Sequence, residues 1–198
     1  MKVIFLDHDG VICLFDNWGS RYKKQKKWDG RKLSMPFHEI PIKYRFDNFN
    51  KKAVAVLNEI LEKTGAEIVI SSDWRYHATI EELGEYYELQ GVIKKPIAVT
   101  GIFKDIYPNE LSCLRHKAEL ELERSMEIDH WLSNHLEITN WVAVDDLNLG
   151  IDFLSSYFIS TYDINNRPGL TNFVHTYKSG EGIKQSGIKE KIIKFLNQ

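Results

Sequence analysis

The stretch that decides the fold is Met1-Lys-Val-Ile-Phe-Leu-Asp-His-Asp-Gly-Val-Ile12. Its apolar run has no polar alternation, which is typical of a strand buried on both faces of a parallel sheet. The run stops at Asp7 and Asp9, which are two residues apart and can therefore turn their side chains toward the same place. Gly10 then allows a sharp bend. The stretch predicts a strand that delivers a catalytic loop, with an Asp-Gly hairpin turn as the alternative.

The composition indicates an ordinary soluble protein. At 198 residues, with 43% apolar and 27% charged residues, the chain has the size of one domain plus a small insertion, so we expect residues 1–198 to form one domain. Cys13 and Cys113 make neither a disulfide framework nor a metal cluster, which suits a reducing cytoplasm. The opening apolar run is too short for a secretory signal, and no run approaches a membrane span. We therefore expect a cytoplasmic protein without membrane contact.

Apolar spacing predicts an alternation of helices and strands after the first strand. Such an alternation favours a parallel α/β sheet. The predicted helices cover residues 49–65, 79–89, 111–135 and 183–196, and the predicted strands cover 66–70, 97–100, 141–146 and 156–160.

The segment 15–46 does not have the pattern of a core element. Within it, Arg21 to Lys32 carries seven basic residues and one acid, or +6, whereas the whole chain carries −2. Trp18, Tyr22 and Trp28 are interleaved with these charges. Basic and aromatic residues together suit a surface that holds a phosphate backbone and stacks bases, although a solvated loop has the same composition. The candidate contacts are Lys23, Lys24, Lys26 and Lys27.

Three predicted strands end in polar clusters. These clusters are Asp7 with Asp9, Ser71 with Ser72 and Asp73, and Asp145 with Asp146. Ligands of open α/β sheets bind beyond the carboxyl ends of the strands, so we expect the clusters to converge. Taken singly, the serines could cap a helix and the later aspartates could be loop carboxylates. Converging carboxylates would repel each other without a cation, and an all-oxygen set favours Mg²⁺.

The ordered motifs resemble those of the haloacid dehalogenase (HAD) superfamily. Within it, Glu67-Ile-Val-Ile-Ser-Ser-Asp-Trp-Arg75 and Arg124-Ser-Met-Glu-Ile-Asp-His-Trp-Leu132 are most similar to the HAD phosphatase domains of RNA repair proteins of the Swiss Army Knife type. The resemblance implies a HAD-like Rossmannoid three-layer α/β sandwich with a central parallel sheet, in which 15–46 is a small cap-like insertion after the first strand.

The resemblance also implies a role for each motif residue. Asp7 would attack phosphorus and form an aspartyl-phosphate, and Asp9 would protonate the leaving oxygen. Ser71 would hydrogen-bond the phosphoryl oxygens. Mg²⁺ would be held by Asp145 and Asp146, together with Asp7 and the backbone carbonyl of Asp9.

The third motif requires a cation, which is either Lys117 or Arg124. The two lie on nearly the same face of one predicted helix. We prefer Arg124, because its distance in sequence from Asp145 matches the family motif, although the superfamily usually has Lys. The alternative is that Arg124 merely pairs with Glu121 or Glu127.

The sequence therefore predicts a Mg²⁺-dependent phosphohydrolase, with a nucleic-acid terminal phosphate as the preferred substrate. A small-molecule phosphomonoester phosphatase and a non-catalytic phosphate- or RNA-binding module are the alternatives. Ser72 and Arg75 are further candidates for substrate contact. Trp74 is either a substrate contact or a core residue, and His8 is expected to pack at the strand end.

Overall fold

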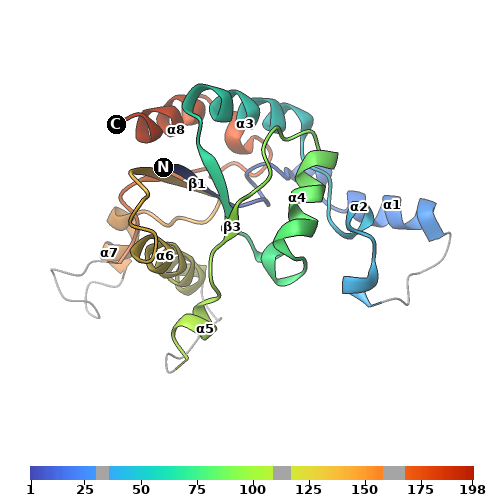
Figure 1. Cartoon of the computed structure of the whole chain (residues 1–198), viewed down its shortest axis with the longest axis horizontal. Coiled ribbons are helices and arrows are strands. Elements are labelled where there is room, and N and C mark those ends of the chain that lie inside the picture. Colours follow the sequence, from blue (N-terminus) through green and yellow to red (C-terminus); the bar gives the residue numbers. More distant parts are fainter. Residues whose placement is uncertain (30–35, 109–116, 158–167) are drawn as a thin grey trace.

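A five-stranded sheet forms the centre of the protein (Figure 1). The computed structural model describes residues 1–29, 36–108, 117–157 and 168–198. The strands are β1 (Lys2–Leu6), β2 (Glu67–Ile70), β3 (Ala98–Val99), β4 (Asn140–Asp145) and β5 (Phe173–His175). Their order is β3-β2-β1-β4-β5, and all four neighbouring pairs are parallel. The predicted α/β class with a central parallel sheet is therefore confirmed.

Helices cover both faces of the sheet, as Figure 1 shows. On one face α3 (Lys51–Thr64), α4 (Ile80–Leu89) and α8 (Ile188–Leu196) share a core with the side chains of β1, β2 and β4. On the other face α6 (Lys117–Ser133) packs against the opposite side chains, and α7 (Ile151–Tyr157) and the short α5 (Phe103–Ile106) lie beside it. No helix in the described ranges is long and apolar enough to cross a lipid bilayer.

Local signals in the sequence fix the ends of the helices that carry the core. Asn50 caps α3 by accepting hydrogen bonds from two backbone N–H groups of the first turn. Gly65 ends α3 with φ of 69°, a conformation that glycine adopts without strain. Thr79 and Glu82 form a capping box at the start of α4. Both helices lie where the apolar spacing predicted them.

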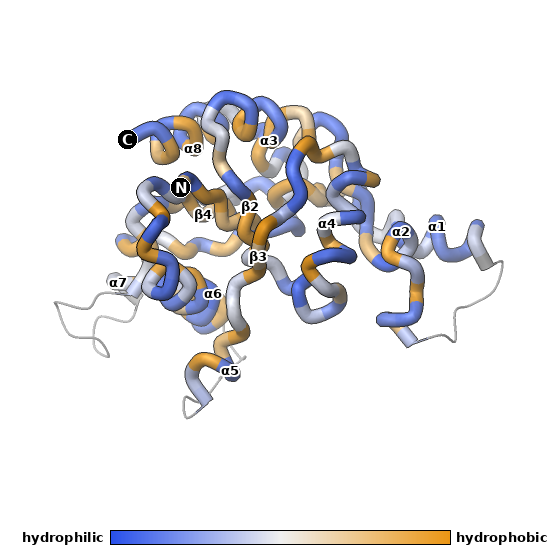
Figure 2. Tube along the Cα trace, viewed as in Figure 1, coloured by the Kyte–Doolittle hydropathy of each residue, from blue (hydrophilic) through white to orange (hydrophobic). Residues whose placement is uncertain are grey.

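The insertion is partly helical and partly buried. It contains α1 (Ser20–Asp29) and α2 (Ile42–Arg45), with 3-10 turns at Phe15–Asn17 and Phe37–Glu39. Figure 2 shows α1 as largely hydrophilic. The prediction that 15–46 stays outside the core is wrong for its C-terminal part, because Ile40 and Phe46 are buried. The Phe46 ring stacks on Trp74 with 4.4 Å between centroids, so the insertion is anchored to the domain.

Two predicted elements differ from the structure near the C-terminus. A strand over 156–160 is wrong for 156–157, which end α7, and 158–160 lie outside the described residues. The last strand is β5, whose three residues are too few to give a clear apolar pattern. Gly187 has φ of 82°, so α8 begins at Ile188 rather than near 183, where a 3-10 turn lies. Of the helix predicted over 111–135, residues 117–133 form α6, which ends two residues earlier than predicted, and 111–116 lie outside the described residues.

Candidate active site

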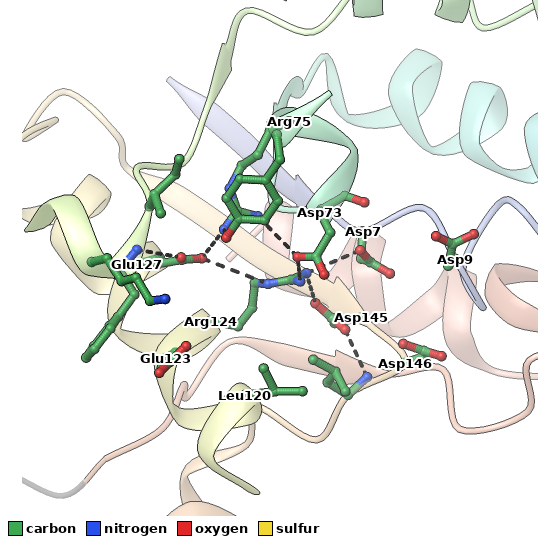
Figure 3. Close-up of a pocket in the computed structure, with 16 residues that line it drawn as sticks. Asp7, Asp9, Asp73, Arg75, Leu120, Glu123, Arg124, Glu127, Asp145 and Asp146 are labelled. Atoms are coloured by element: carbon green, nitrogen blue, oxygen red, sulfur yellow. Dashed lines mark hydrogen bonds and ion pairs between the residues drawn. The ribbon is translucent and has the colours of Figure 1, made fainter. Parts of the chain in front are cut away.

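The carboxyl ends of β1, β2 and β4 bring the three polar clusters together (Figure 3). β1 lies between β2 and β4, at the point where the chain changes the direction in which it adds strands. In open α/β sheets this switch point is where ligands bind. The backbone N–H of Asp7 donates to the Val144 carbonyl at 3.1 Å, and that of Ser71 donates to the Leu6 carbonyl at 3.0 Å. The sheet ladder therefore sets the relative height of the three clusters.

A tight loop follows β1 and carries Asp9. The carbonyl of His8 accepts hydrogen bonds from three consecutive backbone N–H groups, at residues 11 to 13. Gly10 has φ of 72°, and a Cβ placed there would lie 2.3 Å from Asp146 Oδ2. A side chain at position 10 would collide with a carboxylate of the site, so the glycine permits a close approach. The hairpin alternative is wrong, because β1 pairs in parallel with β2 and with β4.

Three carboxylates form the acidic part of the site. Single oxygen atoms of Asp7, Asp145 and Asp146 lie within 4.8 Å of one another. Burial and then repulsion from Asp145 raise the pKa of Asp7, and burial likewise raises the pKa of Asp145. Hard oxygen donors at this spacing, which repel each other when ionised, fit a divalent cation such as Mg²⁺. Asp9 does not belong to this group, and Figure 3 shows its side chain apart from the other three, so only its backbone carbonyl remains as the ligand expected from it.

Arg124 on α6 reaches across to all three strand ends. Its Nη1 lies 3.2 Å from Asp7 Oδ1 and 3.2 Å from Asp145 Oδ2, and it also donates to the backbone carbonyl of Ser71. Its Nη2 donates to Asp73 Oδ1 at 2.7 Å. Burial alone would lower the pKa of Arg124, but the carboxylates of Asp145 and Asp7 raise it, so the guanidinium stays charged. Arg124 therefore lies among the carboxylates of all three strand ends.

The sequence left two alternatives open: Lys117 could be the motif cation, or Arg124 could merely pair with a neighbouring glutamate. Lys117 begins α6, and its side chain lies outside what the structure describes. Pairing of Arg124 with Glu127 is present but weak, because Nε and Oε2 are 3.9 Å apart. Glu121 accepts a hydrogen bond from the backbone N–H of Asn148 at 2.9 Å and so fastens α6 to the loop after β4.

The residues after β2 are divided between the cleft and the interior. Ser72 and Asp73 line the cleft. The hydroxyl of Ser71 is buried and makes no hydrogen bond to any described residue. A buried hydroxyl without a partner is uncommon and leaves Ser71 Oγ available as a donor.

Arg75 and Glu127 form a buried ion pair at the wall of the cleft. Arg75 Nη2 lies 2.6 Å from Glu127 Oε2, and both side chains are almost fully buried. Glu127 Oε1 also accepts from the backbone N–H of Phe103 at 2.8 Å. The sequence indicated Glu127 only as a possible partner of Arg124. Glu127 lies about one helical turn after Arg124 and therefore on the same face of α6, which is the signal that could have placed it at the site. The pair ties the turn after β2 to α6 and α5.

Trp74 is a core residue with a polar contact to the site. Its ring is buried against Phe46 and Phe49, as one of the two predicted alternatives had it. Its Nε1 donates to Asp9 Oδ2 at 2.9 Å. Burial raises the pKa of Asp9, and the hydrogen bond from Trp74 acts in the opposite direction. Trp74 therefore fixes the orientation of the Asp9 carboxyl.

His8 packs in the interior, as predicted. It is fully buried, and its Nε2 lies 2.7 Å from the hydroxyl of Tyr87. Burial lowers its pKa to about 3, so the ring is neutral at physiological pH.

The four candidate lysines of α1 have two environments. Lys23, Lys26 and Lys27 are exposed. Lys24 points back toward the domain, where its Nζ donates to the Phe46 carbonyl at 2.8 Å and to Asn48 Oδ1 at 2.9 Å. Burial lowers its pKa to about 8. Lys24 thus fastens α1 to the segment before α3, and the other three lysines face solvent.

The cluster lines a cleft of about 480 Å³. The cleft, drawn in Figure 3, is lined on its polar side by the acidic group, Arg124, Ser72 and Arg75. Its apolar lining includes Ile102, Phe103 and Leu120. This volume is in the range of small-ligand sites.

Comparison with known protein families gives a match over most of the chain. Residues 3–172 match the family model described as the HAD domain in Swiss Army Knife RNA repair proteins. No curated protein and no solved structure matches the chain.

Proposed function

Because the chain belongs to the family of HAD domains in Swiss Army Knife RNA repair proteins, we propose that it is a Mg²⁺-dependent phosphohydrolase acting on a terminal phosphate of a nucleic acid. The observation that carries the proposal is the group of Asp7, Asp145 and Asp146 at the carboxyl edge of the sheet, in which Arg124 bridges Asp7 and Asp145. An anionic nucleophile beside a fixed cation is what phosphoryl transfer requires.

The reaction proceeds in two displacements. A carboxylate oxygen of Asp7 bonds to phosphorus while the bond to the leaving oxygen breaks, and Asp9 gives that oxygen its proton. Water then attacks the phosphorus of the aspartyl-phosphate, Asp9 takes the proton of the water, and Asp7 is released with inorganic phosphate. Ser71 Oγ, which has no partner among the described residues, donates to a phosphoryl oxygen.

Two features balance the charge of this reaction. Arg124 contacts both Asp7 and Asp145 before substrate arrives and offsets part of their charge, so the nucleophile is held in one orientation. Asp7, Asp145, Asp146 and the Asp9 carbonyl would hold Mg²⁺, which would supply the positive charge that lets an anionic phosphate approach.

The insertion supports the choice of substrate. Lys23, Lys26 and Lys27 are exposed on α1, and we take the described parts of the insertion, 15–29 and 36–46, to act as a small cap beside the site. Contacts with several phosphates would make binding depend steeply on salt.

A substrate screen tests this function. We expect hydrolysis of phosphorylated oligonucleotides with Mg²⁺ and none with EDTA, and restoration when Mg²⁺ is returned. Between about 50 and 200 mM salt, kcat/KM should fall roughly 20- to 40-fold if three phosphates are contacted. Neutralising Lys23, Lys26 and Lys27 should remove most of this salt dependence, with Lys191 and Lys194 of α8 as the matched exposed control pair. Equal salt dependence in both variants, with glycerol phosphate as the better substrate, would instead identify a small-molecule phosphatase.

A second prediction concerns the proton donor. Trp74→Phe keeps an aromatic ring, although a smaller one, and removes the N–H that donates to Asp9 Oδ2 at 2.9 Å. We expect kcat on glycerol phosphate to fall about ten-fold, since the alkoxide leaving group needs a well-placed acid. Turnover of p-nitrophenyl phosphate, whose leaving group needs little protonation, should fall much less. The control is Trp141→Phe, because Trp141 lies near the start of β4, away from the site. An equal loss of turnover on both substrates in Trp74→Phe would contradict the role of Trp74.

A further inference from the structure

A second cleft, of about 550 Å³, adjoins the active site on the side of the insertion. Asp9 and Asp73 line both clefts, so these two residues mark the boundary between them. The other walls include Arg21 and Tyr22 of α1, Phe37 of the following 3-10 turn, and His77. We call this space the insertion cleft.

The insertion cleft offers aromatic surface and a cation. Tyr22 is 61% exposed and Phe37 is 37% exposed, although both border a cleft. The guanidinium carbon of Arg21 lies 5.0 Å from the Tyr22 ring centroid, and Nη2 donates to the Tyr22 hydroxyl at 3.2 Å. Exposed rings beside a guanidinium are the combination that stacks nucleobases and meets a phosphate.

Contacts with the rest of the domain fix the positions of Arg21 and Tyr22. The backbone N–H of Arg21 donates to Asp47 Oδ1 at 2.7 Å, and Nη1 lies 3.9 Å from Asp47 Oδ2. Asp47 is buried. The start of α1 is therefore held against the domain, and a ligand in the insertion cleft would find Arg21 and Tyr22 already in place.

The chemistry of the active site determines which part of a substrate enters the insertion cleft. The phosphorus must lie beside Asp7, and the leaving oxygen must lie within hydrogen-bond reach of Asp9. Since Asp9 stands at the boundary, the group attached to that oxygen extends to the far side of Asp9, into the insertion cleft.

We propose that the insertion cleft holds the terminal nucleoside of the phosphorylated strand, with its base stacked on Tyr22 and with Arg21 facing the next phosphate. This inference rests on the proposed function and names the residues that select a nucleotide over a smaller leaving group. The exposed lysines of α1 then lie along the path of the strand, outside the cleft.

The test compares two substrates with similar alkoxide leaving groups, a phosphorylated trinucleotide and glycerol phosphate. Loss of base stacking in Tyr22→Ala should lower the ratio of their kcat/KM values about ten-fold, whereas Tyr22→Trp should keep the ratio. Tyr177→Ala is the matched control, because Tyr177 is 66% exposed, carries Lys178 over its ring at 5.8 Å, and lies outside both clefts. It should leave the ratio unchanged.

A second measurement does not require turnover. In an Asp7→Asn background, the Kd of the trinucleotide measured by calorimetry should rise about ten-fold when Tyr22→Ala is added. An unchanged ratio and an unchanged Kd would overturn the proposal, as would an equal fall on both substrates. Absence of any hydrolysis by the parent protein would count against the proposed function, and the Kd comparison would still decide whether the insertion cleft binds a nucleotide.

Discussion

Asp7→Asn is expected to abolish phosphatase turnover, with a loss of about 10⁴-fold or more, because an amide cannot form the aspartyl-phosphate. The substitution keeps the shape of the side chain and an oxygen that can accept from Arg124 Nη1, which lies 3.2 Å from Oδ1 in the parent. Steady-state assays with Mg²⁺ measure the loss. Rapid quench with ³²P-labelled substrate should trap a phosphorylated parent protein and no phosphorylated variant.

The stability of this variant separates chemistry from folding. Burial and repulsion from Asp145 raise the folded-state pKa of Asp7, so its ionised form costs stability above its ordinary pKa. At neutral pH without metal, the amide removes that cost, and we expect an unfolding free energy no lower than that of the parent. Asp152→Asn on α7, an exposed carboxylate outside the active-site cleft, is the control for both measurements. Retained turnover in Asp7→Asn would show that Asp7 is not the nucleophile.

Arg124→Ala should lower both stability and activity. The substitution leaves the buried carboxylates of Asp7 and Asp145 without their cation, which costs about 3–5 kcal/mol of unfolding free energy in metal-free buffer. This corresponds to a fall in Tm of roughly 10 °C for a domain of this size. Turnover should fall by about 10³-fold, because the charge that stabilises the transferring phosphoryl group is lost. Calorimetry and steady-state kinetics measure the two effects.

Two further variants separate the loss of turnover in Arg124→Ala from its loss of stability. Arg124→Lys restores one charge but not the two-pronged contact with Asp73 and the strand ends, so about one tenth of parent turnover is expected. Arg45→Ala removes another buried arginine, which lies outside the active site. Its Nη1 forms an ion pair with Glu82 Oε2 at 2.7 Å. It should destabilise the protein while kcat on glycerol phosphate stays within a few-fold of the parent. Full activity in Arg124→Ala would show that the motif cation lies elsewhere.

The sequence predicted the sheet and the helices wherever apolar periodicity was long. The runs that became β1, β2 and β4 carried clear patterns, and α3 also had its caps at Asn50 and Gly65. β5 was missed because three residues cannot show a period. The burial of Phe46 was missed because charges surround it in sequence, whereas its partner Trp74 is a long-range neighbour.

For the site, the sequence predicted residues at strand ends better than contacts between elements. The convergence of Asp7, Ser72 and Asp145 on one cleft followed from the parallel topology. The orientation of Lys24 toward Tyr86 and the hydrogen bond from Trp74 to Asp9 depend on how helices pack, and no spacing encodes them.

The bridging position of Arg124 also makes the site a reporter of complete folding. Its contact with Asp7 joins residues 117 apart in sequence, and the contact with the Ser71 carbonyl joins residues 53 apart. Long loops must close before such contacts form, whereas the helices can form locally and early. During refolding, recovery of turnover should therefore follow completion of the β2-β1-β4 sheet rather than the earlier return of helical circular dichroism.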